Sequence, residues 1–178
     1  MPPKLRIRGQ EWQTGVKYLG VMIDRSMRMA TQVEHAIHQS RFARSILRPV
    51  LQSHLPLQAK MVLYKGYICS RLTYTAPAWY ALCSTSQRKR IQAQQNIALR
   101  MMVGAGQYVL NEVIARDLCI EIVKEFIQHI ARRMYDIADL GPHEFLWNIT
   151  PMHERSPSDR PLPRELLKTP PLKSKNTL

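Results

Sequence analysis

The sequence carries no acidic residue between Glu34 and Glu112, although lysine and arginine recur throughout that stretch. A surface that only has to stay soluble mixes charges of both signs, so solubility is the weaker explanation of this exclusion. The whole chain of 178 residues has 26 Lys+Arg against 13 Asp+Glu, a formal net charge of +13 and a pI near 10.1. These values favour an anionic partner, either nucleic acid or an anionic membrane surface.

Cysteines are few and hydrophobic runs are short. Cys69, Cys83 and Cys119 are odd in number and have no metal-ligand spacing, which argues against a disulfide framework and favours a reducing, intracellular compartment. Residues 1–4, MPPK, contain no apolar signal core, and no window approaches 18 uninterrupted apolar residues. We therefore expect neither secretion nor a membrane span.

Patterns typical of catalysis or metal binding are also missing. The sequence has no glycine-rich phosphate loop, no Gly-x-Ser-x-Gly elbow and no adjacent pair of aspartates. Asp136 and Asp139 lie one helical turn apart, but their place on the exposed side of an amphipathic helix is typical of solvated charges. His35 and His38 lack the two further ligands that a zinc site needs. We expect no metal site and no catalysis by the chain on its own.

The first 25 residues predict a small antiparallel β unit. Strands are expected at residues 5–8 and 11–13, and a third strand at Val16–Ile23. The run VKYLGVMID at residues 16–24 has two interpretations, a core strand or a contact surface, because a glycine inside a strand often marks a bulge or the close approach of another backbone. Two or three strands alone do not stay folded, so this unit requires a hydrophobic partner layer.

The residues that follow predict a helix from Thr31 to Leu51, because apolar or small residues recur every three or four positions. Its expected buried face comprises Ala36, Ser40, Ala43, Leu47 and Val50. A neighbouring stripe holds three arginines at spacings of three and four, Arg41, Arg44 and Arg48. This stripe is either a ridge that follows phosphates or a solvated edge.

Further helices are predicted at residues 57–72, 86–103, 111–118 and 122–140. Their expected buried faces are Leu57, Met61, Tyr64 and Ile68 in the first, Ile91, Gln95, Ala98 and Met102 in the second, and Val123, Ile127, Ile130, Met134 and Ile137 in the last. The expected helix ends are a capping box at Thr31 and Glu34, a stop at residues 104–106 and a cap at Asn111. Pro77 restricts the backbone of Ala76 and is expected to interrupt the helix at this point.

Beyond residue 142 the chain becomes proline-rich and basic, and residues 151–178 have a composition typical of disorder. The predicted fold is therefore mainly α, with a small N-terminal antiparallel β-hairpin or meander packed on a helical bundle and a disordered C-terminal tail.

Several phrases together resemble a known family. They are VKYLGVMID at 16–24, LRPVLQ at 47–52, LYKGYICSRLTYTAPAW at 63–79, IQAQQNIALRMMVGA at 91–105 and YVLNEVIARDLCI at 108–120. In this order and spacing they resemble the C-terminal end of the reverse transcriptase domain of non-LTR retrotransposons (LINE elements) of the jockey type. The resemblance covers about residues 5–140. Cys119 departs from the family, since a glycine is typical at that position.

The resemblance implies a division of the chain into parts. Residues 1–25 correspond to the end of the palm, where Lys17-Tyr18-Leu19-Gly20 falls in the hairpin called the primer grip. Residues 30–105 correspond to a thumb-like helical domain and residues 108–145 to helices after the thumb. The aspartates that hold Mg²⁺ in the family would lie before Met1, in a palm and fingers that this fragment lacks, so we expect no cofactor and no polymerisation by the fragment itself.

The resemblance and the basic stretch together predict a fragment of an RNA-directed DNA polymerase whose thumb-like region binds an RNA or DNA template–primer duplex nonspecifically, through phosphates. The expected contact residues are Lys17, Tyr18, Leu19, Gly20, Arg41, Arg44, Arg48, Lys60, Lys65, Arg88, Lys89, Arg90 and Arg100. The alternative is a helical protein-interaction module, or an inert or repurposed retroelement remnant, which the more acidic helix at 122–140 favours. A membrane surface is the weaker partner, because no predicted helix pairs a basic face with exposed Trp or Phe.

Overall fold

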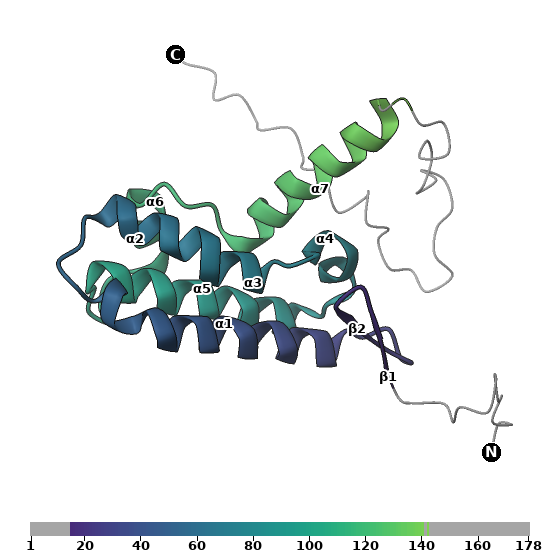
Figure 1. The fold of residues 1–178 in the computed structure, drawn as a ribbon, viewed down its shortest axis with the longest axis horizontal. Coiled ribbons are helices and arrows are strands. Elements are labelled where there is room, and N and C mark those ends of the chain that lie inside the picture. Colours follow the sequence, from purple (N-terminus) through teal and green to yellow (C-terminus); the bar gives the residue numbers. More distant parts are fainter. Residues whose placement is uncertain (1–14, 141, 143–178) are drawn as a thin grey trace, which may run out of the picture.

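The computed structural model describes residues 15–140 and 142. These residues form a mainly helical fold with a two-stranded antiparallel hairpin at its N-terminal end, as predicted (Figure 1). The strands expected at residues 5–8 and 11–13 and the tail at 151–178 lie outside the described residues.

The run at residues 16–24 is a complete hairpin and not one strand. Strands β1 (Gly15–Tyr18) and β2 (Val21–Asp24) pair antiparallel. Leu19 and Gly20 form the two-residue loop, with φ angles of 46° and 81°. Two positive φ values are typical of the type I′ turn, whose twist matches that of the paired strands. The prediction of a single strand at Val16–Ile23 is wrong because both halves favour β structure and only one glycine marks the reversal.

Three helical segments form the bundle beside this hairpin. Helix α1 spans Ala30–Leu51 and packs on α5 (Thr85–Val103). The run from residue 57 to residue 72 is helical throughout, as predicted, but its middle is a π-helix. Its parts are α2 (Leu57–Leu63), η1 (Tyr64–Cys69) and α3 (Ser70–Leu72). Figure 1 shows α1, α5 and this run lying side by side.

The remaining elements cover one side and one end of the bundle. They are α4 (Ala76–Trp79), the 3₁₀ turn η2 (Tyr80–Leu82), α6 (Asn111–Asp117) and α7 (Val123–Leu140). The predicted break falls before Pro77, which lies in the first turn of α4, where its missing N–H leaves no hydrogen bond unmade. Helix α7 packs on α4 and α5 at its start and then extends away from the bundle (Figure 1).

Local residues cap α5 at both of its ends. The Ser84 hydroxyl accepts a hydrogen bond from the N–H of Gln87, whose side chain in turn accepts one from the N–H of Ser84, completing a capping box. At the other end Gly104 adopts φ 66° and stops the helix, as predicted.

Two predicted caps are wrong. The residue before α1 is Met29, with φ 56° and no side-chain cap, and the carboxylate of Glu34 forms an ion pair with Arg90 at 2.6 Å in place of a capping box with Thr31. Leu110 precedes α6, and the side chain of Asn111 accepts a hydrogen bond from Arg100. In both cases the helix begins at or before the expected cap, so Thr31 and Asn111 lie inside its first turn.

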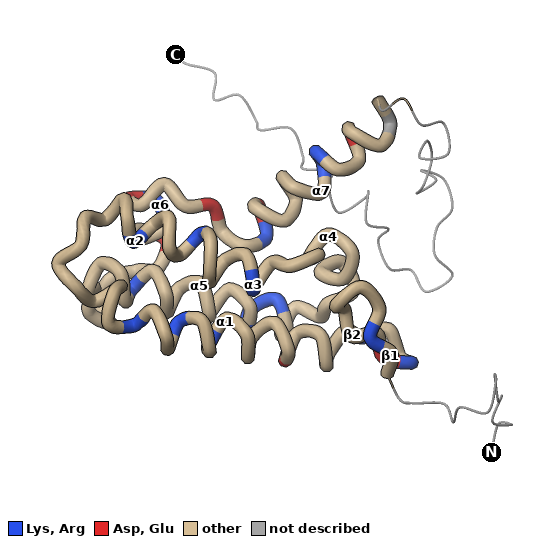
Figure 2. Tube along the Cα trace, in the orientation of Figure 1, with Lys and Arg blue, Asp and Glu red and all other residues tan. Residues whose placement is uncertain are grey.

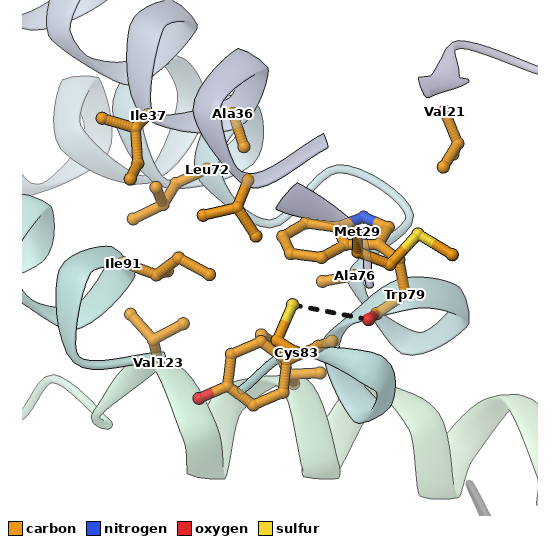
Figure 3. Close-up of a cluster of buried hydrophobic side chains, with 13 residues drawn as sticks. Val21, Met29, Ala36, Ile37, Leu72, Ala76, Trp79, Cys83, Ile91 and Val123 are labelled. Carbon is orange, nitrogen blue, oxygen red and sulfur yellow. Dashed lines mark hydrogen bonds between the residues drawn. The ribbon is translucent and has the colours of Figure 1, made fainter. Parts of the chain in front are cut away.

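The core has two parts. The first joins the hairpin, α1, α4 and α7 around the buried Trp79, whose Nε1 donates to the carbonyl of Tyr74 at 2.9 Å (Figure 3). Cys83 lies in the same cluster and its thiol donates to the carbonyl of Trp79 at 3.6 Å. The second part joins α1, η1, α5 and α6 and includes Tyr64 and Leu99.

The residues predicted to be buried on α1 and α5 are buried or partly buried, as expected. Three residues predicted to be buried on the other helices are exposed. Leu57 lies in the first turn of α2, at an end of the bundle where no element covers it. Met134 and Ile137 are exposed because the second half of α7 extends beyond its packing partners. None of the described helices is long and apolar enough to cross a bilayer.

Candidate nucleic-acid interface

A groove opens where the hairpin meets α1 and α3. Its lining residues are Lys17, Gly20, Gln32, His35, Ala36, Gln39, Ser70, Arg71 and Tyr74. We refer to it as the hairpin groove. It brings Lys17 and Gly20, which were predicted as contact residues, together with Arg71 and Tyr74, which were not. The described residues that line it include cationic, aromatic and neutral hydrogen-bonding groups but no carboxylate.

Tyr74 fixes the turn of the hairpin. Its hydroxyl donates to the carbonyl of Leu19 at 3.4 Å, and a Cβ atom added to Gly20 would come within 3.1 Å of its ring. Gly20 is thus required both by its φ of 81° and by the closeness of this ring. Sequence reasoning missed Tyr74 as a site residue because its contact with Gly20 spans more than fifty positions, and only its place in the phrase TYTAPAW pointed to it.

The hairpin packs on the bundle through β2, which contacts α1. Val21 is its buried residue, and the N–H of Met22 donates to the side chain of the buried Gln32 at 2.8 Å. Lys17, Tyr18 and Leu19 are exposed, so the tip presents one cation and two large side chains to solvent.

The three arginines of α1 share one side of the helix, as predicted, and that side faces α5. Arg41 Nε and Arg44 Nη1 both donate to Gln94 Oε1, at 3.4 and 3.2 Å, while Arg48 Nε donates to Gln52 Oε1 at 3.4 Å. Arg44 is half-buried, and burial together with the charge of Arg41 lowers the pKa of its guanidinium. Arg41 and Arg48 remain exposed, so the stripe is not a uniform ridge.

Three other predicted contact residues hold the fold together. Lys60 is buried, and its Nζ donates to the carbonyl of Met102 at the end of α5. Arg88 donates to the carbonyl of Ala81 at 2.9 Å and lies 5.3 Å from the ring centroid of Tyr80.

Arg100 makes the most extensive of these contacts. It donates to Asn111 Oδ1 at 2.8 Å, to the carbonyl of Gly106 at 2.7 Å and to the carbonyl of Val109. Its guanidinium thereby bridges the segment between α5 and α6.

Three exposed cations lie in the stretch of residues 35–111, which carries no carboxylate. Lys65, Arg71 and Lys89 are exposed and form no ion pair with any described residue. Arg90 is paired with Glu34, and its hydrogen bond lowers the pKa of that carboxyl. Figure 2 shows Lys and Arg on most elements, α7 among them, whereas most Asp and Glu of the described residues lie on α6, α7 and the segment between them. Within the described ranges no three His, Cys, Asp or Glu side chains come together as a metal site.

The sequence of the chain is similar to those of known proteins. The chain is 27% identical over 158 residues to the probable RNA-directed DNA polymerase from transposon X-element of Drosophila melanogaster, a match that covers 88% of this chain and 17% of that protein. It is 26% identical over 155 residues to the RNA-directed DNA polymerase from mobile element jockey of Drosophila funebris, with 85% and 17% covered. The chain is a relative of retrotransposon RNA-directed DNA polymerases.

A third such relative is the probable RNA-directed DNA polymerase from transposon BS of Drosophila melanogaster, 27% identical over 122 residues, with 67% of this chain and 13% of that protein covered. The matched region thus spans 13–17% of the length of these retrotransposon polymerases, so the chain corresponds to a fragment of them. No family model matches the chain. No solved structure matches it either.

Proposed function

We propose that this polymerase-related region binds nucleic acid through backbone phosphates, as part of the grip on a template–primer duplex. The observation that carries the proposal is the exclusion of carboxylates from residues 35–111, which form most of α1 and all of the elements up to α6. A stretch of chain that carries cations and no negative charge of its own attracts polyanions.

The proposed contact residues are the exposed cations of residues 35–111 that form no ion pair with a described residue, together with Lys17 on the hairpin. They are Lys17, Arg41, Arg48, Lys65, Arg71 and Lys89. Lys60, Arg88 and Arg100 do not belong to this set because their donors are engaged within the fold, Arg44 because it is half-buried, and Arg90 because Glu34 pairs with it.

The hairpin groove adds a second kind of contact. Lys17 and Arg71 can bind phosphates there, and the exposed ring of Tyr74 offers a face for a sugar or base. The assignment of the hairpin to a primer grip and of α1 to α5 to a thumb is part of this proposal. Binding without catalysis is what we assign to the described residues.

The test is a salt titration of binding to an RNA–DNA duplex, followed by fluorescence anisotropy. Six phosphate contacts predict a slope of log K against log salt of about −4 to −5, since each contact contributes about −0.7 to −0.9. A slope near zero, or no binding at low salt, would contradict the proposal.

A paired charge change identifies the face. Changing Arg41→Gln and Arg48→Gln together should make the slope less negative by about 2, roughly 1 for each phosphate that is no longer bound. The matched control removes the same charge elsewhere, through Arg116→Gln and Lys124→Gln on α6 and α7, and should leave the slope unchanged. Equal effects of the two pairs would mean that net charge alone drives binding.

A protein-interaction module is the second candidate, favoured by apolar side chains exposed on α7. A partner protein that stays bound after Arg41, Arg44 and Arg48 are all changed to Glu, while duplex binding disappears, would support this candidate.

A further inference from the structure

Helix α7 exposes an apolar side in its second half. Val123, Ile127 and Ala131 are buried against the bundle, whereas the side chains of Met134, Ile137 and Leu140 are 56%, 68% and 87% exposed. We refer to these last three residues as the α7 stripe. Figure 1 shows this part of α7 extending beyond the bundle. An amphipathic helix whose apolar stripe continues past its packing partners has a surface suited to another apolar segment.

The chain itself supplies such a segment directly after the helix. Residues 143–150 read HEFLWNIT, so Phe145, Leu146, Trp147 and Ile149 place large apolar side chains within a few positions. From residue 151 onward the chain is rich in proline and charge instead. Pro142 lies in a bend, and its ring prevents α7 from continuing as a regular helix.

The lengths permit a return along the helix. Met134 lies six residues before Leu140, a rise of about 9 Å at roughly 1.5 Å per residue. An extended run of five residues after the bend covers about 16 Å. The segment therefore reaches the whole of the α7 stripe with residues to spare.

We propose that residues 143–149 turn back after Pro142 and pack their apolar side chains on the α7 stripe. Covalent attachment a few residues away gives this segment a far higher effective concentration at the stripe than a separate molecule has. A second copy of the chain and an unrelated apolar partner are the competing occupants, and the experiment distinguishes them.

The experiment measures how far Trp147 is shielded from solvent in the full chain. In a Trp12→Phe background the tryptophans are Trp147 and Trp79, and Trp79 is only 1% exposed. Changing Ile137→Ser should raise the acrylamide quenching constant at least about twofold, because it removes the central contact of the stripe. The matched control is Val62→Ser, an equally exposed apolar residue (70%) on α2, which should leave quenching unchanged.

A second pair of variants tests the contact from the other partner. Phe145→Ser should increase amide hydrogen exchange in the last two turns of α7, whereas Leu166→Ser, in the proline-rich tail, should not. Full quenching of Trp147 in the parent, or no response to Ile137→Ser and Phe145→Ser, would overturn the proposal. If the shielding of Trp147 weakened on dilution and sedimentation showed a dimer, the stripe would be covered by a second copy of the chain. That result would also overturn the proposal.

Discussion

Cys119 occupies a backbone position that favours glycine. Its φ is 51°, and the N–H groups of Cys119 and Ile120 donate to the carbonyls of Arg116 and Ala115 at 3.0 and 2.9 Å. This pair of hydrogen bonds is the Schellman motif, which ends α6. The resemblance to the retrotransposon family led us to expect a glycine here, and the turn forms with a cysteine at this position.

Replacing Cys119→Gly should stabilise the fold. A residue with a Cβ atom in the left-handed region destabilises the fold by about 1–2 kcal/mol. Glycine removes this strain but raises the entropy of the unfolded chain, which offsets about 0.4–1 kcal/mol of the gain. The side chain of Cys119 is exposed, so little burial is sacrificed. We expect a net gain of roughly 0.5–1 kcal/mol in urea unfolding.

The control for that change is Cys119→Ala, which removes the thiol but keeps the Cβ atom. It should not raise the free energy of unfolding. If alanine stabilised the protein as much as glycine did, the thiol and not the backbone angle would be responsible.

At the scale of elements, the spacing of apolar residues predicted where the helices lie. The features that it did not predict, such as the turn of the hairpin, involve contacts between residues far apart in the sequence. The faces of α1 and α5 could be predicted because each buries one stripe against the other. The reversal at Leu19 could not be, because it depends on Tyr74 packing against Gly20. The π-helix η1 leaves the apolar spacing nearly unchanged, so no pattern in the sequence indicates it.

The same limit applies to the basic residues. The sequence groups thirteen residues as contacts, but nothing local distinguishes Arg100, which binds backbone carbonyls, from Arg41, which remains exposed. Only the position of the segment between α5 and α6 makes that distinction. Charge density along the chain therefore indicates where cations are concentrated, but not which of them remain exposed.

Arg100 should behave as a residue that stabilises the link between α5 and α6. Changing Arg100→Met leaves the carbonyls of Gly106 and Val109 and the amide of Asn111 without this donor. Water replaces part of the missing hydrogen bonding, so we expect unfolding to cost about 1–3 kcal/mol less. Hydrogen exchange should rise at residues 105–111.

Lys89→Met on the exposed side of the same helix is the matched change. It should alter the free energy of unfolding by no more than about 0.5 kcal/mol. If Lys89→Met destabilised the protein as much as Arg100→Met did, the destabilisation would come from charge on α5 and not from the bridge.

At the scale of the whole molecule, the charge separates residues 35–111, which carry no carboxylate, from the more acidic α6 and α7. The core clusters do not follow this division. Trp79 and its neighbours bury residues from the hairpin, α1 and α7 together, so the basic and the acidic parts share one core (Figure 3). A change that loosens this core is therefore expected to affect the hairpin and α7 at once. The thiol of Cys83 offers a way to weaken the core by pH alone.

Burial raises the pKa of the Cys83 thiol from about 9 to about 11, with the charge of Arg88 acting weakly in the opposite direction. Between these pH values the unfolded chain loses the proton while the folded chain retains it. The unfolded state then binds fewer protons, so the free energy of unfolding falls as pH rises from 9 to 11. Below pH 9 the thiol is protonated in both states and contributes no slope.

A Cys83→Ala variant isolates this contribution, because Cys69, Tyr64 and Tyr80 also have raised pKa values and act in the same direction in both proteins. At pH 7 the variant should be less stable, since it loses a buried sulfur and its hydrogen bond to the carbonyl of Trp79. From pH 9 to pH 11 it should lose less stability than the parent, so the two urea midpoints should converge. Midpoints that stay a constant distance apart over this range would show that the folded core does not hold the Cys83 proton.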